Sequence, residues 1–168
     1  AVGYTGQQAG FITTSGRHTN SRVAEIDGSR IMGELDSGKV VVVCGFQGVD
    51  DNLDETVLGR GGSDLSAVAL AWALNADSCE IFTDVEGVFT ADPRVVTEAR
   101  KIENISPDEM LELASAGARV LYSRSVEFAK KHGVVIHCRS TFSKATGTLI
   151  HEDAAMMEAV LVRGIAHD

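Results

Sequence analysis

The order of strand-like and helix-like segments most restricts how this chain can fold. KVVVVCGF (39–46) and VVIHCRS (134–140) are β-branched, apolar runs. Such runs are typical of strands buried on both faces, as in a parallel sheet. VAEID (23–27) alternates apolar and polar residues, which predicts a half-buried strand, and CEIF (79–82) and GTLI (147–150) predict two short strands. Strands therefore recur along the whole chain.

Helical segments separate these strands. We expect helices over SRIMGELDSG (29–38), SDLSAVALAWALNA (63–76), SPDEMLELASAG (106–117) and YSRSVEFAKKHG (122–133). The helix at 63–76 is apolar on most of its surface, so it should be buried, with Ser63 or Asp64 as its cap. Ser106, Pro107 and Glu109 form a capping-box pattern at the third helix. The alternation predicts an α/β fold, with a mostly parallel sheet sandwiched by helices.

The composition excludes several functions. The chain has 168 residues, 44% of them hydrophobic, which suits one domain with a core. A net charge of −9 argues against nucleic acid as a partner, because phosphate binding needs clustered Lys and Arg. The apolar runs are too short to span a membrane. We therefore expect neither a nucleic-acid nor a membrane partner.

The cysteines and histidines give no metal-binding pattern, and we predict no protein-held metal. Each of the three cysteines lies in an apolar run, which predicts buried thiols on strands in a reducing compartment, the cytoplasm. They are Cys44, Cys79 and Cys138. Three histidines have no metal-binding spacing to cysteines or carboxylates, and we interpret them as structural or surface residues. They are His18, His132 and His137.

The stretch TVLGRGGSD (56–64) places an arginine among three glycines at the start of a buried helix. Glycines let the backbone approach a ligand, and the guanidinium of Arg60 is a two-pronged donor for a carboxylate or a phosphate. The stretch therefore suggests an anion site, although a tight turn with a surface arginine explains it equally well. Asp64 either orients cations that face an anion or only caps the helix.

A second polar cluster, TDVEGVFTADPR (83–94), directly follows the strand CEIF. Its hydroxyls and carboxylates suit a ribose, Arg94 suits a phosphate, and Phe89 suits a base. The alternative is a long structural loop that ends in an Asp-Pro turn. Gly45 and Gly48 follow another predicted strand, and ligands in open α/β sheets lie at the carboxyl ends of strands.

Five ordered blocks carry a resemblance to a known family. They are VVVVCGFQGVD, TVLGRGGSD, FTDVEGVFTADPR, KIENISPDEMLELASAGARVL and RSVEFAKKHGVVIHCRSTFS. Together they resemble aspartokinase, which phosphorylates the side-chain carboxylate of aspartate, over essentially the whole chain. The resemblance implies the nucleotide-binding half of an amino-acid kinase fold. It also implies that residues 1–150 belong to the catalytic domain and that 151–168 lead into a regulatory ACT domain.

The resemblance also implies residue roles on the aspartate side. Arg60 matches the arginine that binds the α-carboxylate of aspartate. Gly45, Phe46 and Ser63 match residues that border the amino acid. Asp64 matches a catalytic aspartate that organises the lysines around the phosphates, which would explain an acid beside an anion site.

On the nucleotide side the resemblance implies six contacts with ATP. They are Thr83, Asp84, Phe89, Arg94, Arg119 and Val120. Arg119 stands where the family has a catalytic lysine, and Tyr122-Ser123 stand where it usually has His-Pro. Arginine keeps the charge but is planar and longer, so the exchange is not neutral.

The implied reaction is attack by the carboxylate of L-aspartate on the γ-phosphorus of ATP, with Mg²⁺. The family's Lys-Phe-Gly-Gly-Thr-Ser segment is absent from the sequence, so we expect the isolated chain to be inactive and prone to associate. Expected partners are L-aspartate, ATP, and either further copies of the chain or the absent N-terminal half. Three alternatives stay open: a non-catalytic nucleotide-binding module, a regulatory or assembly subunit, and a kinase for another amino acid.

Overall fold

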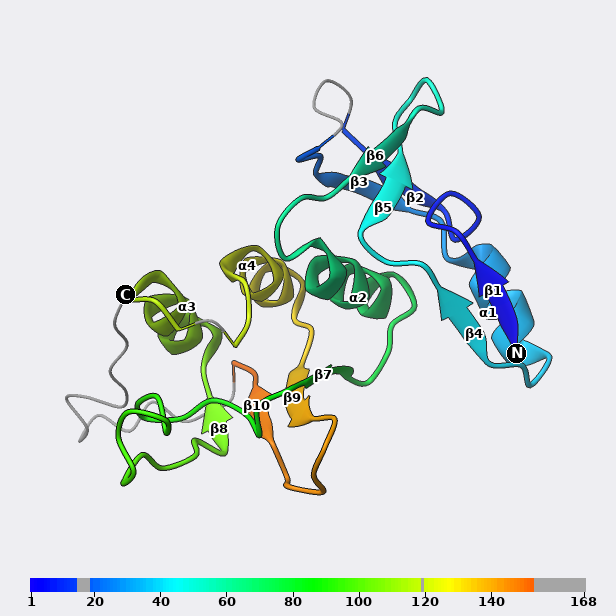
Figure 1. Cartoon of the computed structure of the whole chain (residues 1–168). Helices are drawn as coiled ribbons and strands as arrows, with labels where there is room; N and C mark the ends of the chain where they lie inside the picture. Colours follow the sequence, from blue (N-terminus) through cyan, green and yellow to red (C-terminus); the bar gives the residue numbers. More distant parts are fainter. Residues whose placement is uncertain (15–18, 119, 153–168) are drawn as a thin grey trace. The chain divides into compact units, whose positions relative to one another are not determined.

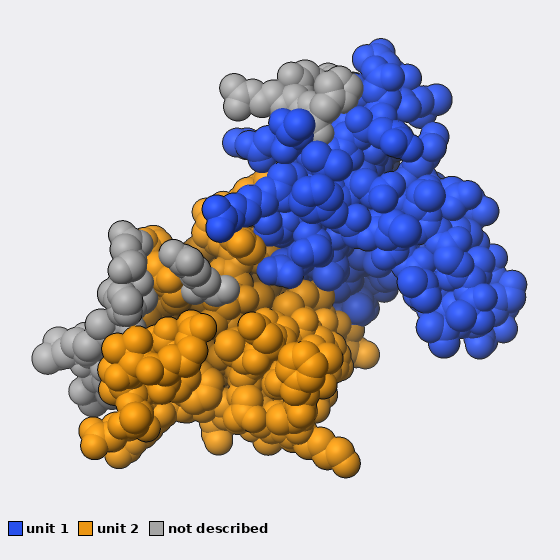
Figure 2. All heavy atoms as spheres, in the orientation of Figure 1, with its two compact units in different colours: residues 1–76 blue, residues 77–168 orange. Residues whose placement is uncertain are grey.

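The computed structural model describes residues 1–14, 19–118 and 120–152. The chain divides into two compact units, Ala1–Ala76 and Asp77–Asp168, which Figure 2 distinguishes by colour. Each unit has a sheet and helices of its own (Figure 1). The α/β class predicted from the sequence is confirmed.

The first unit contains a two-stranded and a four-stranded sheet. In the smaller sheet β1 (Val2–Tyr4) pairs in parallel with β4 (Val41–Val43). The larger has the order β3-β2-β5-β6 and mixes parallel and antiparallel pairs. Its strands are β2 (Phe11–Thr13), β3 (Val23–Ile26), β5 (Gln47–Val49) and β6 (Glu55–Val57). The strands β5 and β6 form an antiparallel hairpin.

Two helices complete this unit, α1 (Ser29–Asp36) and α2 (Gly62–Ala73). Ile31 of α1 is buried, and the Tyr4 hydroxyl donates a hydrogen bond to the Glu34 carboxylate (2.9 Å), which ties α1 to β1. Val68 of α2 is fully buried, as predicted for this apolar helix. The large buried apolar side chains of the unit come from both helices, from β1, β2 and β5, and from Leu58 after β6.

The prediction that the run at 39–46 is a strand buried on both faces is wrong for the described residues. Val40 and Val42 are 66% and 58% exposed. The strand is short, and β1 is its only hydrogen-bonded neighbour in the described sheets. Val40 and Val42 are two residues apart, so their side chains point to the same face of the strand, and that face is left exposed. Cys44 at its end is exposed as well, which corrects the prediction that all three thiols are buried.

The second unit is built on one four-stranded sheet of order β7-β9-β10-β8. β7 pairs in parallel with β9 and β10 in parallel with β8, whereas β9 and β10 are antiparallel. The strands are β7 (Cys79–Thr83), β8 (Asn104–Ile105), β9 (Ile136–Ser140) and β10 (Thr148–Ile150). Helices α3 (Pro107–Ser115) and α4 (Ser123–His132) lie on one side of the sheet (Figure 1).

Local sequence signals explain where these helices begin and end. The Ser106 hydroxyl accepts the N–H of Glu109, and the Glu109 carboxylate accepts the N–H of Ser106, so the predicted capping box is confirmed. Gly133 ends α4 in the left-handed conformation that glycine adopts most easily. No helix among the described residues is long and apolar enough to cross a membrane.

Candidate functional site

The predicted aspartate-side residues lie on two neighbouring segments of the first unit. Gly45 and Phe46 form the connection from β4 to β5, and Arg60 lies in the turn that leads into α2. Ser63 and Asp64 lie in the first turn of α2. The predicted cap is wrong, because the helix begins at Gly62 with left-handed Gly61 as its N-cap and no side-chain cap. Glycine occupies the N-cap position because the turn requires a positive φ, which glycine adopts without a steric penalty.

One buried hydroxyl joins these two segments. Ser66, in α2, is 3% exposed. Its Oγ accepts a hydrogen bond from the backbone N–H of Phe46 (3.1 Å) and donates one to the carbonyl of Ser63 (2.8 Å). We did not single out Ser66 from the sequence, although a polar residue within the apolar run LSAVALAWAL is a usable signal.

Phe46 has an unusual backbone for a bulky residue, with φ of 71°. Its carbonyl accepts a hydrogen bond from Leu58 (2.9 Å), and its side chain is 42% exposed. A Cβ on Gly62 would lie 2.9 Å from the Phe46 ring, so only glycine fits beneath it. Such strain persists only where the surroundings hold it, and it concentrates at functional sites.

The two charged residues of this group differ in their surroundings. Arg60 is exposed, whereas Asp64 is half-buried. Burial raises the pKa of the Asp64 carboxyl above its ordinary value of 3.8. The N–H groups of a first helical turn have no intrahelical acceptors, so they can bind an anion. An exposed guanidinium beside such a turn can bind a carboxylate.

The predicted nucleotide-side residues lie in the second unit. Thr83 is the last residue of β7, and its hydroxyl donates to the Asp84 carboxylate (3.1 Å). Phe89 forms an isolated antiparallel bridge with Lys101, so this part of the predicted loop is a short two-stranded segment. Arg94 makes two hydrogen bonds to the Asp92 carboxylate, from Nε (3.1 Å) and Nη2 (2.9 Å). Its guanidinium is therefore paired within its own loop.

Two further predicted contacts follow α3. Val120 is half-buried. Arg119 lies outside the described residues. Of the predicted residues, the structure thus joins Phe46 and Ser63 through Ser66, and Thr83 with Asp84. The aspartate-side and nucleotide-side groups belong to different units.

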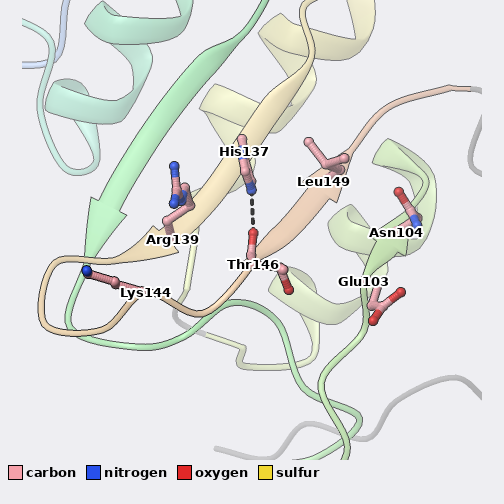
Figure 3. A pocket seen from close by; sticks show the side chains of 8 residues that line it. Glu103, Asn104, His137, Arg139, Lys144, Thr146 and Leu149 are labelled. Atoms are coloured by element: carbon pink, nitrogen blue, oxygen red, sulfur yellow. Dashed lines mark hydrogen bonds between the residues drawn. The ribbon is translucent and has the colours of Figure 1, made fainter.

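A pocket of about 470 Å³ on the second unit was not predicted from the sequence (Figure 3). His137 is central to it: Nε2 donates to the Thr146 carbonyl (2.6 Å), and Nδ1 lies 3.4 Å from the Glu80 carboxylate. Arg139 donates to the same carboxylate (2.7 Å). The pocket is lined by Glu103, Asn104, His137, Arg139, Lys144, Thr146, Gly147 and Leu149.

This pocket corrects the expectation that 134–140 is buried on both faces. Cys138 is buried, but His137 and Arg139 on the opposite face are only partly covered. The signal in the sequence was the alternation IHCRS, in which every second residue is polar. His137 is half-buried and hydrogen-bonded to the Thr146 carbonyl, and its interpretation as a structural or surface residue stays a prediction.

Comparison with protein families gives a match to the amino acid kinase family over residues 1–140. Aspartokinase 2 of Bacillus subtilis is 55% identical over 168 residues, which is all of this chain and 41% of that protein. The chain therefore spans about two fifths of the length of the curated relatives it matches.

Solved structures give the same picture. E. coli aspartokinase III, in complex with aspartate and ADP, superposes with a TM-score of 0.80 at 30% identity. It covers 92% of this chain, which corresponds to 36% of that one. Aspartate kinase from Synechocystis has a TM-score of 0.75 at 47% identity, covering 93% of this chain and 25% of that one. The chain belongs to the amino acid kinase family, and the relatives that it resembles along its whole length are aspartokinases.

Proposed function

We propose that this chain is part of an aspartate kinase, which transfers the γ-phosphoryl group of MgATP to the side-chain carboxylate of L-aspartate. One observation carries the proposal: aspartokinases match the chain at about half of all positions, from its first residue to its last. Solved proteins that share this fold include kinases named for other substrates, so the fold alone would not indicate aspartate.

The first unit supplies the aspartate contacts in this proposal. The exposed guanidinium of Arg60 binds the α-carboxylate, and Gly45, Phe46 and Ser63 border the amino acid. Support comes from the local geometry, since Phe46 and Ser63 are joined through one hydroxyl and Arg60 lies two residues before the helix. The E. coli relative was solved with aspartate and ADP bound, which supports an amino-acid site and a nucleotide site.

The second unit supplies the nucleotide contacts. Thr83 ends β7 and Asp84 follows it directly, at the carboxyl end of a parallel strand, where nucleotides bind in open α/β sheets. Arg94 binds a phosphate in this proposal only after it exchanges its carboxylate partner, Asp92, for the ligand. Phe89, Arg119 and Val120 complete the proposed ATP contacts.

Phosphoryl transfer needs positioning and positive charge more than covalent help. Bound MgATP supplies the phosphoryl group and part of that charge. Arg119 adds a permanent positive charge, and Asp64 orients the cationic groups that act on the phosphates. Asp64 performs this role as a carboxylate, and burial disfavours its charged form, so nearby cations must offset that cost.

The test is an Arg60→Ala variant of the full gene product. We expect the KM for aspartate to rise by a factor of about 100 or more, because a charge-assisted bidentate contact is lost, while the KM for ATP changes little. Arg22→Ala, at another arginine of the first unit, is the control. An unchanged KM for aspartate in the Arg60→Ala variant would remove Arg60 from the site.

The second candidate is a chain that binds nucleotide or assembles with a longer polypeptide without catalysis. A kinase assay and a nucleotide-binding assay on the 168-residue chain separate the two candidates. Binding without transfer supports a binding module, and co-purification with a longer aspartokinase chain supports an assembly role.

Three further features belong to the proposal. Residues 151–168 lead into a regulatory ACT domain, although 153–168 lie outside the described residues. Copies of the chain associate with each other or with an N-terminal half. The protein works in the reducing cytoplasm, in keeping with Cys44, Cys79 and Cys138 as free thiols.

A further inference from the structure

We propose that Ser66 is a positioning residue of the aspartate site. Its buried hydroxyl holds the strained Phe46 against the first turn of α2, so that Phe46 and Ser63 face aspartate as one rigid group. The inference rests on the proposed function and deepens it, because Ser66 acts through those two residues.

The hydroxyl of Ser66 uses both of its hydrogen-bonding functions. Its proton goes to the Ser63 carbonyl three residues earlier (2.8 Å), and its lone pair accepts the Phe46 N–H (3.1 Å). Only the first bond is ordinary for a serine within a helix. The second reaches twenty residues back along the chain to a different segment.

Ser125 shows what the ordinary arrangement looks like. It is fully buried in α4, and its hydroxyl donates to the Tyr122 carbonyl three residues earlier (2.7 Å). Burial, residue type and helical bond therefore match those of Ser66. The contact with a strained residue of another segment distinguishes Ser66.

Phe46 needs this support because its φ of 71° is unfavourable for a residue with a bulky side chain. Three contacts hold it in place: the Ser66 hydroxyl at its N–H, Leu58 at its carbonyl and Gly62 under its ring. The bond between the Phe46 N–H and the Ser66 hydroxyl can be removed by substituting a side chain. The bond from Leu58 cannot, because it joins two backbone groups.

Gly45 fits the same arrangement. A Cβ at position 45 would lie 2.6 Å from the Ser66 Oγ, closer than any real contact. The Ser66 hydroxyl can therefore occupy this position only because residue 45 has no side chain. Without the hydroxyl, Phe46 can move toward a less strained backbone conformation. Because Phe46 is proposed to border aspartate, this movement would change the shape of the aspartate site.

The test compares Ser66→Ala, Ser66→Thr and Ser125→Ala in the full gene product. For Ser66→Ala we expect the KM for aspartate to rise about tenfold, because one hydrogen bond to the site is lost, with the KM for ATP within about twofold. Ser66→Thr retains the hydroxyl and should keep the KM for aspartate within about threefold of wild type. Ser125→Ala should leave both KM values unchanged.

Amide hydrogen exchange at Phe46 provides a second readout, independent of turnover. The Phe46 N–H should exchange about tenfold faster or more in Ser66→Ala than in wild type or Ser66→Thr. Faster exchange together with the selective rise in aspartate KM supports the inference.

Two results would overturn this inference but leave the proposed function intact. One is an unchanged KM for aspartate when Ser66→Ala is introduced into an active enzyme. The other is a rise in the KM for aspartate in Ser125→Ala that equals the rise in Ser66→Ala. A wild-type gene product that folds and binds MgATP but never phosphorylates aspartate would instead refute the proposed function, and the inference with it.

Discussion

The packing of Gly45 against Ser66 makes a prediction that does not depend on catalysis: the two substitutions Gly45→Ala and Ser66→Ala should not be additive. A methyl group at position 45 would lie 2.6 Å from the Ser66 Oγ, but 3.8 Å from its Cβ. In Gly45→Ala the hydroxyl must therefore rotate away. It then loses the hydrogen bonds to Phe46 and Ser63 that Ser66→Ala also removes.

The size of the effect follows from these two bonds. Both hydrogen bonds are partly buried, and each contributes about 0.5–1.5 kcal/mol to the free energy of unfolding, so each single variant should be destabilised by about 1–3 kcal/mol. In the double variant the oxygen is absent and the new methyl group meets no atom closer than ordinary contact. The double variant should therefore be about as stable as Ser66→Ala, with a coupling energy of about 1–3 kcal/mol.

Urea unfolding of the 168-residue chain measures this cycle. The chain contains one tryptophan, Trp72, which lies in α2 and is 41% exposed. Its fluorescence therefore reports on the helix that carries Ser66. Gly33→Ala, where a Cβ meets nothing within 4 Å, is the glycine control. Strict additivity of Gly45→Ala and Ser66→Ala would refute the packing argument.

Two further predictions concern buried polar groups of the first unit. The hydroxyls of Thr13 and Thr56 lie 2.6 Å apart and both residues are almost fully buried. Thr56→Val leaves the Thr13 hydroxyl without this partner, so the free energy of unfolding in urea should fall by about 1–3 kcal/mol. Adding Thr13→Val to the same chain should restore most of that free energy, because both hydroxyls are then absent. Burial raises the pKa of Asp64, so its contribution to stability is complete below its unfolded pKa and is lost as pH rises through its folded pKa. Asp64→Asn should therefore gain stability relative to wild type as pH rises across that interval, in thermal melts from about pH 3 to 7. Its kinase activity should be lost in the full gene product. A stability difference that is independent of pH would contradict the burial argument.

Much of the fold could be predicted from local signals. The capping box at Ser106 and the glycine after α4 set the helix boundaries because they act on neighbouring backbone groups. The order of strands and helices gave the α/β class. These features depend on residues close in sequence, and the sequence shows them directly.

Burial was predicted less well, because it depends on which segments cover a strand. Val40 and Val42 are the residue type typical of buried strands, yet the face to which both side chains point is exposed. His137 and Arg139 lie on a strand whose apolar residues face only one side. A β-branched run indicates a strand but does not indicate how many of its faces are covered.

The candidate site likewise has features that local sequence predicted and features that depend on tertiary contacts. The glycine and arginine pattern at 59–62 indicated a place where a ligand can approach, and family resemblance supplied the ligand. The contact of Ser66 with Phe46 could not be predicted, because it joins residues twenty positions apart through a strained turn. Likewise, the pairing of Arg94 with Asp92 required side-chain positions.

Direct detection of aspartyl phosphate tests the central claim best. The full gene product is incubated with MgATP and hydroxylamine, which traps an acyl phosphate as a hydroxamate, and with aspartate, glutamate or N-acetylglutamate as acceptor. We predict ATP-dependent hydroxamate with aspartate, and far less with the other two acceptors. Hydroxamate formed preferentially from glutamate or N-acetylglutamate, or none formed by a folded protein that binds MgATP, would contradict it.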